Sequence, residues 1–341
     1  MNNSDSLFLK ALNKEKLPTP PVWYMRQAGR YMPEYRKLRK NFKNFLDMCK
    51  NPEVCCELAL QPIDAFNLDA SILFSDILTI PDAFGLGVNF IENEGPVFAK
   101  PINTPIDVSN LTHFNPSDLD YVYKAVTNIR NSLPEDIPLI GFCGSPWTLA
   151  AYSIEGRSSR DFAKTLNFIK TNNTVSHELL SKYTDACFLY LRKQVQSGAD
   201  VIQIFDSWAG LISPNDLPNY CYIPNLKIVD FCKKMKIPVI CFPKGINENY
   251  KEFNNVVKPN GVNLDFDVDP NWAKRNLSNV VFQGGLSPNI LLSNDKEIFS
   301  ATKKYLDIFK DVPYIFNLGH GLLPETDPGK VGKLVKFYKE Y

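Results

Sequence analysis

The chain has 341 residues, of which 44% are apolar and 22% are charged, so it has enough apolar sequence to bury a large core. Its formal net charge of +1 argues against a general nucleic-acid binder, and its 8 cysteines form neither a CxxC pair nor a Cys/His cluster with zinc spacing. It contains no uncharged apolar run of about 18 residues and no recognisable signal peptide. We therefore expect a cytoplasmic protein with reduced cysteines, no disulfide framework and no membrane-spanning segment.

Eight short runs in the sequence are typical of strands that are buried on both faces, because they are continuously apolar rather than alternating. The segments between them place apolar residues at helical spacing, as in residues 161–198, which end on Ser-Gly. The predicted strands are residues 21–25, 70–76, 138–144, 200–207, 238–244, 261–266, 280–285 and 314–320.

Eight strands that alternate with helices predict an α/β protein with a closed parallel sheet, the (β/α)8 or TIM barrel, as a single domain over residues 1–341. An open doubly wound sheet is the alternative arrangement. No GxGxxG follows an early strand, which weakens the nucleotide-binding version of that alternative. Residues 84–100 interrupt the alternation and indicate a small hairpin excursion rather than a helix.

The N-terminal part of the chain is rich in arginine. Its ordinary interpretation is a solvated surface face, but Arg26 ends an apolar run and Gly29 interrupts any regular helix. Arginine offers a planar fork of donors that binds carboxylate or phosphate oxygens in pairs. The segment therefore predicts a local site for a polyanionic ligand. Between residues 26 and 40 it has one acid, Glu34, and six basic side chains: Arg26, Arg30, Arg36, Lys37, Arg39 and Lys40.

In barrels of this kind the active site forms at the carboxyl ends of the strands. Asp76 lies in a strongly apolar stretch, where an unpaired buried carboxylate is costly, so we expect hydrogen-bond donors near it. Asp206 and Asp265 are equally consistent with helix caps or scaffold, and we expect Trp23 in the core. The polar residues that end the predicted strands are Arg26, Asp76, Ser207, Lys244, Asp265 and His320.

Several longer motifs resemble one known family. Residues 25–36 (MRQAGRYMPEYR) and 141–156 (GFCGSPWTLAAYSIEG) are similar to the two signatures of the uroporphyrinogen decarboxylase family. Four shorter motifs fall in that family's order and spacing, so that the resemblance covers essentially the whole chain. They are FSDIL (74–78), QIFDSWAG (203–210), FQGGLSP (282–288) and FNLGHG (316–321).

The resemblance implies a fold and an activity. The fold is again a single (β/α)8 barrel. The reaction removes carbon dioxide from the four acetate side chains of uroporphyrinogen III, a tetrapyrrole with eight carboxylates, and gives coproporphyrinogen III for haem synthesis. The family needs no cofactor and no metal, because a protonated pyrrole accepts the electrons that decarboxylation leaves behind. It also implies a cytoplasmic homodimer with a small-molecule substrate and no nucleic-acid partner.

The resemblance also assigns roles to residues. Arg26, Gln27, Arg30 and Arg39 match carboxylate contacts, and Asp76 matches the aspartate that accepts hydrogen bonds from the pyrrole N–H groups. Tyr152 and Ser207 match residues near the reacting acetate, and His320 matches a carboxylate contact. The predicted catalytic residues are Asp76, Arg26 and Tyr152. Position 208 is Trp where many members have histidine, so the role of that side chain stays open.

Three questions remain open at this point. Arg26 is either the proton donor or a carboxylate anchor, and His320 or Tyr152 would be the better acid by intrinsic pKa. A zinc-dependent methyltransferase of the same superfamily is the first alternative, although the strand ends CFPKG and FQGG lack the His/Cys ligands that it needs. A porphyrin-binding protein without catalysis is the second.

Overall fold

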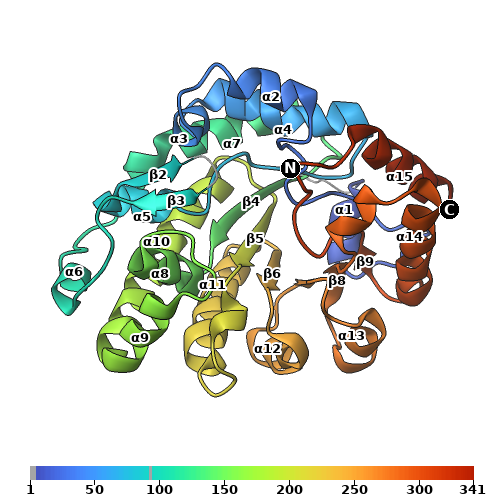
Figure 1. The fold of residues 1–341 in the computed structure, drawn as a ribbon. Coiled ribbons are helices and arrows are strands. Elements are labelled where there is room, and N and C mark those ends of the chain that lie inside the picture. Colours follow the sequence, from blue (N-terminus) through green and yellow to red (C-terminus); the bar gives the residue numbers. More distant parts are fainter. Residues whose placement is uncertain (1–4, 92–93) are drawn as a thin grey trace.

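Seven parallel strands form one curled sheet in the computed structural model, which describes residues 5–91 and 94–341 (Figure 1). Every residue of β4 and β6 is buried, as predicted for continuously apolar strands. The order of the strands in the sheet is β1-β4-β5-β6-β7-β8-β9. Their bounds are β1 (Ser71–Ile72), β4 (Leu139–Gly144), β5 (Val201–Asp206), β6 (Val239–Pro243), β7 (Gly261–Leu264), β8 (Val281–Gly284) and β9 (Tyr314–Ile315).

The first predicted strand closes this sheet into a barrel. Val22 forms a parallel bridge with Phe316, just beyond β9, and the Trp23 N–H donates to the Phe316 carbonyl at 3.3 Å. On its other side the Val22 carbonyl accepts from the N–H of Asp69 at 2.8 Å, and the Val22 N–H donates to the Asp69 carboxylate at 2.8 Å. The barrel prediction is confirmed, but residues 21–25 contribute one bridge rather than a full strand.

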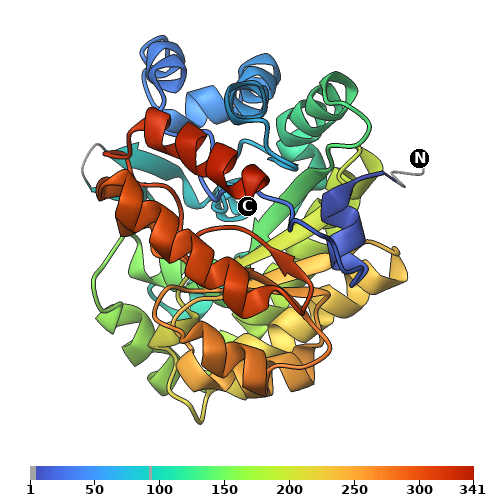
Figure 2. The same cartoon turned by 90° about the vertical axis from the view of Figure 1, so that its right-hand side faces the viewer.

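Helices follow the strands and cover the outside of the barrel (Figures 1 and 2). The predicted helical segment 161–198 contains two helices that are separated at Asn172, whose φ of −128° and ψ of 50° are not helical. The bounds are α1 (Leu7–Leu12), α2 (Pro33–Arg39), α3 (Phe45–Cys49), α4 (Pro52–Phe66), α5 (Thr79–Pro81), α6 (Pro105–Ser109), α7 (Asp120–Ser132), α8 (Pro146–Glu155), α9 (Ala163–Thr171), α10 (Asn173–Gln196), α11 (Ile223–Lys234), α12 (Tyr250–Val257), α13 (Pro270–Asn276), α14 (Asp295–Phe309) and α15 (Pro328–Glu340).

The interior of the barrel is filled by apolar side chains and one polar layer. Trp23 is in the core, as predicted, and its Nε1–H donates to Oε1 of Gln283 at 2.9 Å. The Nε2 of Gln283 in turn donates to Asn263 at 2.8 Å and to Gln203 at 3.2 Å. A single glutamine thus joins β8 to β7, β5 and the closing segment. At the amino-terminal end, α1 packs Phe8 against the same interior cluster.

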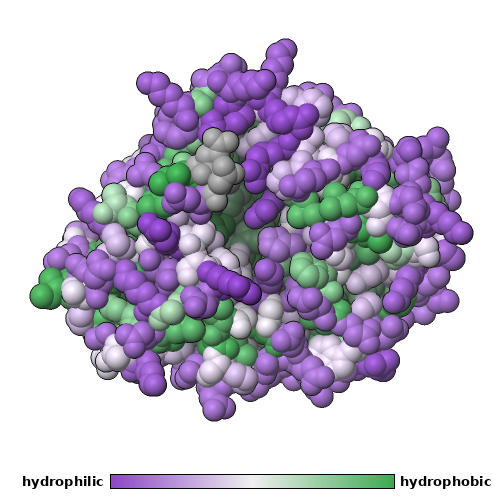
Figure 3. Space-filling model, in the orientation of Figure 1, coloured by the Kyte–Doolittle hydropathy of each residue, from purple (hydrophilic) through white to green (hydrophobic). Residues whose placement is uncertain are grey.

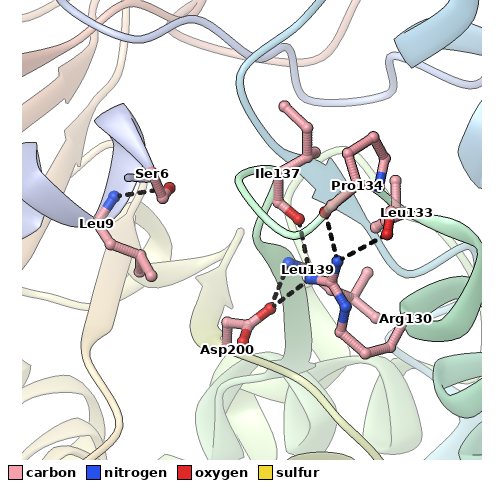
Figure 4. A network of polar contacts seen from close by, with 8 residues as sticks. All are labelled: Ser6, Leu9, Arg130, Leu133, Pro134, Ile137, Leu139 and Asp200. Atoms are coloured by element: carbon pink, nitrogen blue, oxygen red, sulfur yellow. Dashed lines mark hydrogen bonds and ion pairs between the residues drawn. The ribbon is translucent and has the colours of Figure 1, made fainter. Parts of the chain in front are cut away.

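A second network fixes that amino-terminal end from outside (Figure 4). The guanidinium of Arg130, on α7, pairs with the Asp200 carboxylate at 2.9 Å and donates to the Ile137 carbonyl at 2.8 Å. Asp200 also accepts from the N–H of Leu139 at 2.9 Å. Because Leu139 begins β4 and Asp200 precedes β5, this network sets the register of the two strands where they enter the barrel.

The excursion at residues 84–100 contains the predicted hairpin, with antiparallel strands β2 (Val88–Ile91) and β3 (Gly95–Phe98); residues 92–93 of that segment lie outside the described part. The hairpin lies at the end of the barrel opposite α1 (Figure 2). Its β3 strand is bonded to the loop after α8, since the Phe98 N–H donates to Gly156 at 2.8 Å and the Ser158 N–H donates to Pro96 at 3.3 Å.

Two expectations about the whole chain can be checked over the described ranges. All eight cysteines lie within those ranges and none of them is in a disulfide. Of the helices in residues 5–91 and 94–341, none has the length and apolar character needed to cross a membrane.

The polar layer gives a test of the filled barrel. Gln283→Leu keeps the approximate volume of the side chain. It leaves the Trp23 indole N–H without its acceptor, and the side-chain oxygens of Gln203 and Asn263 without their donor. We expect the free energy of unfolding in urea to fall by about 3 kcal/mol. Gln196→Leu, at an exposed position of α10, should change it by less than about 0.5 kcal/mol. Equal effects of the two substitutions would contradict a stabilising role for the Gln283 hydrogen bonds.

Candidate active site

The loops that follow the strands surround a hollow at the end of the barrel that carries the hairpin. In the orientation of Figure 1 the hollow lies over β4 and β5, with hydrophilic residues around the opening and apolar residues deeper (Figure 3). The predicted site residues sit on these loops. Arg26 follows the closing segment, Asp76 follows β1, Tyr152 is on α8, Ser207 follows β5 and His320 follows β9.

Arg26 occupies an unusual backbone conformation. Its φ is +61°, in the left-handed region that non-glycine residues rarely adopt, and such outliers cluster at functional sites. The turn is held from within: the Gln27 N–H donates to the Tyr24 carbonyl at 2.9 Å, and the Tyr24 N–H donates to Gln27 Oε1 at 3.1 Å. Gln27 Nε2 donates to the Ala70 carbonyl at 3.2 Å. The buried Gln27 amide therefore uses both its polar groups inside the protein.

The guanidinium of Arg26 has no hydrogen bond or ion pair among the described residues, and the same is true of Arg30. Arg26 is exposed to solvent, yet burial is the main cause that lowers its pKa, which is the combination expected of a side chain inside a cleft. Its stem lies over Gly321, where a Cβ would come within 2.6 Å of Arg26 Cγ. A side chain at position 321 would therefore require the Arg26 stem to move.

The other two arginines of the segment bind backbone. Arg39 donates to the Phe42 carbonyl at 2.7 Å, and Arg36 donates to the carbonyls of Arg30 and Tyr31 at 2.8 Å each. Arg36 thus fixes the loop that carries Arg30. The structure brings Arg26 and Arg30 close enough for each charge to be felt by the other, since Arg30 contributes to lowering the pKa of Arg26.

Asp76 is a half-buried carboxylate with few donors. Its Oδ1 accepts from the Leu78 N–H at 2.8 Å, and no arginine or lysine forms an ion pair with it in the described part of the chain. Burial raises the pKa of Asp76 to about 6, against the lowering effects of the Leu78 N–H and the Arg26 charge. The donors expected near this acid are therefore only partly supplied by the protein, so the carboxylate can accept further hydrogen bonds from a ligand.

Tyr152 and His320 complete the polar lining. Burial raises the pKa of the Tyr152 phenol. The nearby charge of Asp76 also raises this pKa, and the charge of Arg26 lowers it. Burial lowers the pKa of His320 to about 3, with the charges of Arg26 and Lys244 adding to the effect. His320 Nδ1 accepts from the Gly321 N–H at 2.6 Å, so Nε2 carries the proton in the neutral ring. His320 is then a hydrogen-bond donor without charge at neutral pH.

Two acids at the strand ends belong to the scaffold. Asp206 is buried and accepts from Thr148 Oγ1 at 2.8 Å and from Asn225 Nδ2 at 3.0 Å. Asp265 is buried and accepts from the Gly245 N–H at 2.7 Å and the Tyr250 hydroxyl at 3.2 Å. Neither forms an ion pair in the ranges described. Both satisfy their oxygens with neutral donors and leave the cations of the cleft unpaired.

Three further features belong to the cleft: Lys244, which the sequence analysis named without a role, Ser207, which it matched to a residue near the reacting acetate, and a group of aromatic rings that it did not predict. The Lys244 ammonium, half-buried after β6, also has no partner in the described part of the chain. Phe205 meets Phe142 edge-on at 5.6 Å, and Phe242 meets the His320 ring at 6.4 Å. Because these phenylalanines come from β4, β5 and β6, over which the hollow lies, we infer that they form an aromatic floor below it. The Ser207 hydroxyl is partly exposed beside this floor and has no described partner.

No metal centre is apparent in the described ranges, where no group of three or more His, Cys, Asp or Glu side chains is arranged to hold an ion.

The candidate site is a cleft with three unpaired cations, one incompletely satisfied carboxylate, a protonated phenol and an aromatic floor. This set suits a ligand that is flat or cyclic, carries several carboxylates and offers N–H donors.

Comparisons with solved structures identify the fold. A methyltransferase from Methanosarcina mazei superposes with a TM-score of 0.79 over 98% of both chains, at 19% sequence identity. A B12-independent methionine synthase from Shewanella sp. W3-18-1 gives a TM-score of 0.52 over 84% of this chain and 85% of its own, at 11% identity. At such low identities the likeness concerns the fold alone.

Comparisons of sequence identify the family. The profile of the uroporphyrinogen decarboxylase (URO-D) family matches residues 3–341. A uroporphyrinogen decarboxylase from Dichelobacter nodosus is 44% identical over 342 residues, which cover 98% of this chain and 97% of that relative. Another, from Wolbachia pipientis wMel, is 41% identical and covers 94% of both. The profile and the relatives agree over nearly the full length, and the chain belongs to the uroporphyrinogen decarboxylase family.

Proposed function

We propose that the protein removes the carboxyl groups of the four acetate side chains of uroporphyrinogen III and releases coproporphyrinogen III. The observation that carries this function is the charge balance of the cleft. Arg26, Arg30 and Lys244 have no acidic partner in the described chain, and the one free acid among them is Asp76. Arg26 and Arg30 are exposed and Lys244 is half-buried, so all three charges are open to a polyanionic ligand, and this substrate brings eight carboxylates.

Asp76 is suited to bind the N–H groups at the centre of the ligand rather than its carboxylates. A tetrapyrrole that lies over the aromatic floor directs its N–H groups inward, and Asp76 offers them a carboxylate with free acceptor capacity. When a pyrrole ring becomes cationic, the same carboxylate stabilises the charge in a site that is already arranged for it. We therefore assign Asp76 the central catalytic role.

The reaction balances with one proton taken up and one carbon dioxide released for each acetate. A proton adds to a ring carbon of the pyrrole, which becomes a cation. The bond from the methylene carbon to the carboxylate then breaks, carbon dioxide leaves, and the electron pair neutralises the ring. A proton adds to the exocyclic methylene to give a methyl group, and the ring carbon returns its proton. The substrate thus supplies its own electron sink.

Two side chains hold a proton at neutral pH and interact with Asp76, namely Arg26 and Tyr152. Either of them is a candidate proton donor, and Arg26 is also a candidate to bind the leaving carboxylate. His320 is neutral above about pH 3, so it acts as a hydrogen-bond donor to a substrate carboxylate rather than as a cationic acid. Arg30 and Lys244 bind further carboxylates, and Gln27 holds the turn under Arg26.

We extend the proposal to the setting of the enzyme, where it rests on the family resemblance. We expect a single-domain cytoplasmic enzyme that works as a homodimer without cofactor or metal. Light scattering of the purified protein tests the dimer, and a mass near that of one 38.7 kDa chain would contradict it.

The direct test of the function is an anaerobic incubation of the protein with uroporphyrinogen III in the presence of a chelator. After oxidation, the products are separated by their number of carboxylates. We expect intermediates with seven, six and five carboxylates and a final product with four. A persistent eight-carboxylate peak from folded protein would overturn the function, and zinc in that protein would favour the methyltransferase alternative.

The raised pKa of Asp76 predicts a pH dependence. Below about pH 6 the carboxylate is protonated and loses the charge that stabilises the cationic ring, so kcat/KM should fall as the pH drops through about 6. His320→Gln should keep this acidic limb, because the pKa of His320 at about 3 lies outside the window. Loss of the limb in His320→Gln would assign the titration to the histidine instead.

A further inference from the structure

Trp208, whose role the sequence analysis left open, is held in place by contacts that suggest a function for its side chain. The backbone of Trp208 is fixed on both sides by α8. Its N–H donates to Thr148 Oγ1 at 3.3 Å, and its carbonyl accepts from the Trp147 indole at 2.8 Å. Thr148 is itself bound to the buried Asp206 at 2.8 Å. Tyr152 follows Thr148 by one helical turn, so the same helix positions both Trp208 and Tyr152.

The side chains of Trp208 and Tyr152 are also in contact. Their rings lie 5.8 Å apart at an interplanar angle of 74°. Phe162 packs against both, at 4.4 Å from Trp208 and 5.6 Å from Tyr152. Phe162 is fully buried with a φ of +49°, a strained conformation for a bulky residue. Strain of this kind persists only where the surrounding packing enforces it, so the three rings form a rigid group.

One polar atom of this group is unexplained. The Trp208 Nε1–H is buried and has no partner with hydrogen-bond geometry among the described residues. Tyr152 is the polar side chain whose ring contacts the indole, at 5.8 Å between ring centroids, and Trp208 lowers the pKa of the phenol, which burial otherwise raises. Ser158 has a similar, smaller effect on Tyr152. Catalytic hydrogen bonds are often long or poorly aligned before the substrate binds.

We propose that Trp208 is a positioning residue, which donates its indole N–H to the phenolic oxygen of Tyr152 when the substrate occupies the cleft. An indole can only donate, so the Tyr152 oxygen must accept from it and its own O–H proton must point elsewhere. Because Trp208 and Phe162 pack against the Tyr152 ring, we infer that the proton points away from these two rings and into the cleft. Tyr152 then presents its proton to the substrate. This inference rests on the proposed function for its consequence, but not for its geometry.

A double-mutant cycle measures the consequence. Trp208→Phe keeps an aromatic ring and removes the N–H; we expect kcat to fall about 10-fold with KM changed less than 2-fold, because orientation rather than binding is lost. In a Tyr152→Phe background the same substitution should lower kcat by less than 2-fold. Equal losses in the two backgrounds would overturn the proposal. Trp272→Phe, on the outer helix α13, is the matched control and should leave kcat unchanged.

A spectroscopic measurement keeps the geometry testable without turnover. The chain has 4 tryptophans, so an indole 15N-labelled sample gives four N–H signals, and Trp208→Phe identifies the relevant one. We expect this signal to move downfield when oxidised uroporphyrin III binds, and to lose that shift in Tyr152→Phe. A signal that is indifferent to both changes would overturn the proposal even if the enzyme is active. Absence of decarboxylation with the shifts intact would instead overturn the proposed function alone.

Discussion

The separation of acids from bases around one cleft is the constraint on which the rest of the site depends. Asp206 and Asp265 lie at the same end of the barrel as Arg26 and Lys244 and carry the charges that would neutralise them. Both acids instead accept hydrogen bonds from hydroxyl, amide and backbone donors in the interior. The cations are left for a ligand, because an ion pair within the protein would have to be broken before a substrate carboxylate could bind.

The closing segment of the barrel brings the principal groups together. Residues 21–23 lie between Phe316, just after β9, and Asp69, two residues before β1. Arg26 therefore emerges beside the loop of His320 on one side and the loop of Asp76 on the other. Gly321 leaves room for the stem of Arg26, and the buried Gln27 holds its left-handed turn. The polar layer around Gln283 secures the same segment from below through Trp23. The same segment therefore closes the barrel and positions the residues of the site.

The sequence predicted the parts of this protein that depend on local pattern. Continuous apolar runs identified the strands, and the residues that end them included Asp76, Lys244 and His320. What it missed depends on partners that are distant along the chain. Nothing near Asp206 indicates that Thr148 and Asn225 satisfy it, and residues 21–25 could not be recognised as a single bridge rather than a strand. The break at Asn172 and the aromatic floor were likewise decided by packing.

The measurement that tests the central claim most directly compares binding with turnover in Asp76→Asn. Asparagine removes a negative charge from a site for an octa-anion, so the Kd for oxidised uroporphyrin III, followed by fluorescence quenching, should be unchanged or lower. The loss of the charge that stabilises the cationic ring should reduce kcat by about 1,000-fold or more. The variant should stay folded at pH 7.5. Burial raises the pKa of Asp76 to about 6, so at this pH the ionised carboxylate is unfavourable in its site and a neutral amide is not. A kcat within about tenfold of the wild type, or a Kd that weakens in step with kcat, would contradict the account.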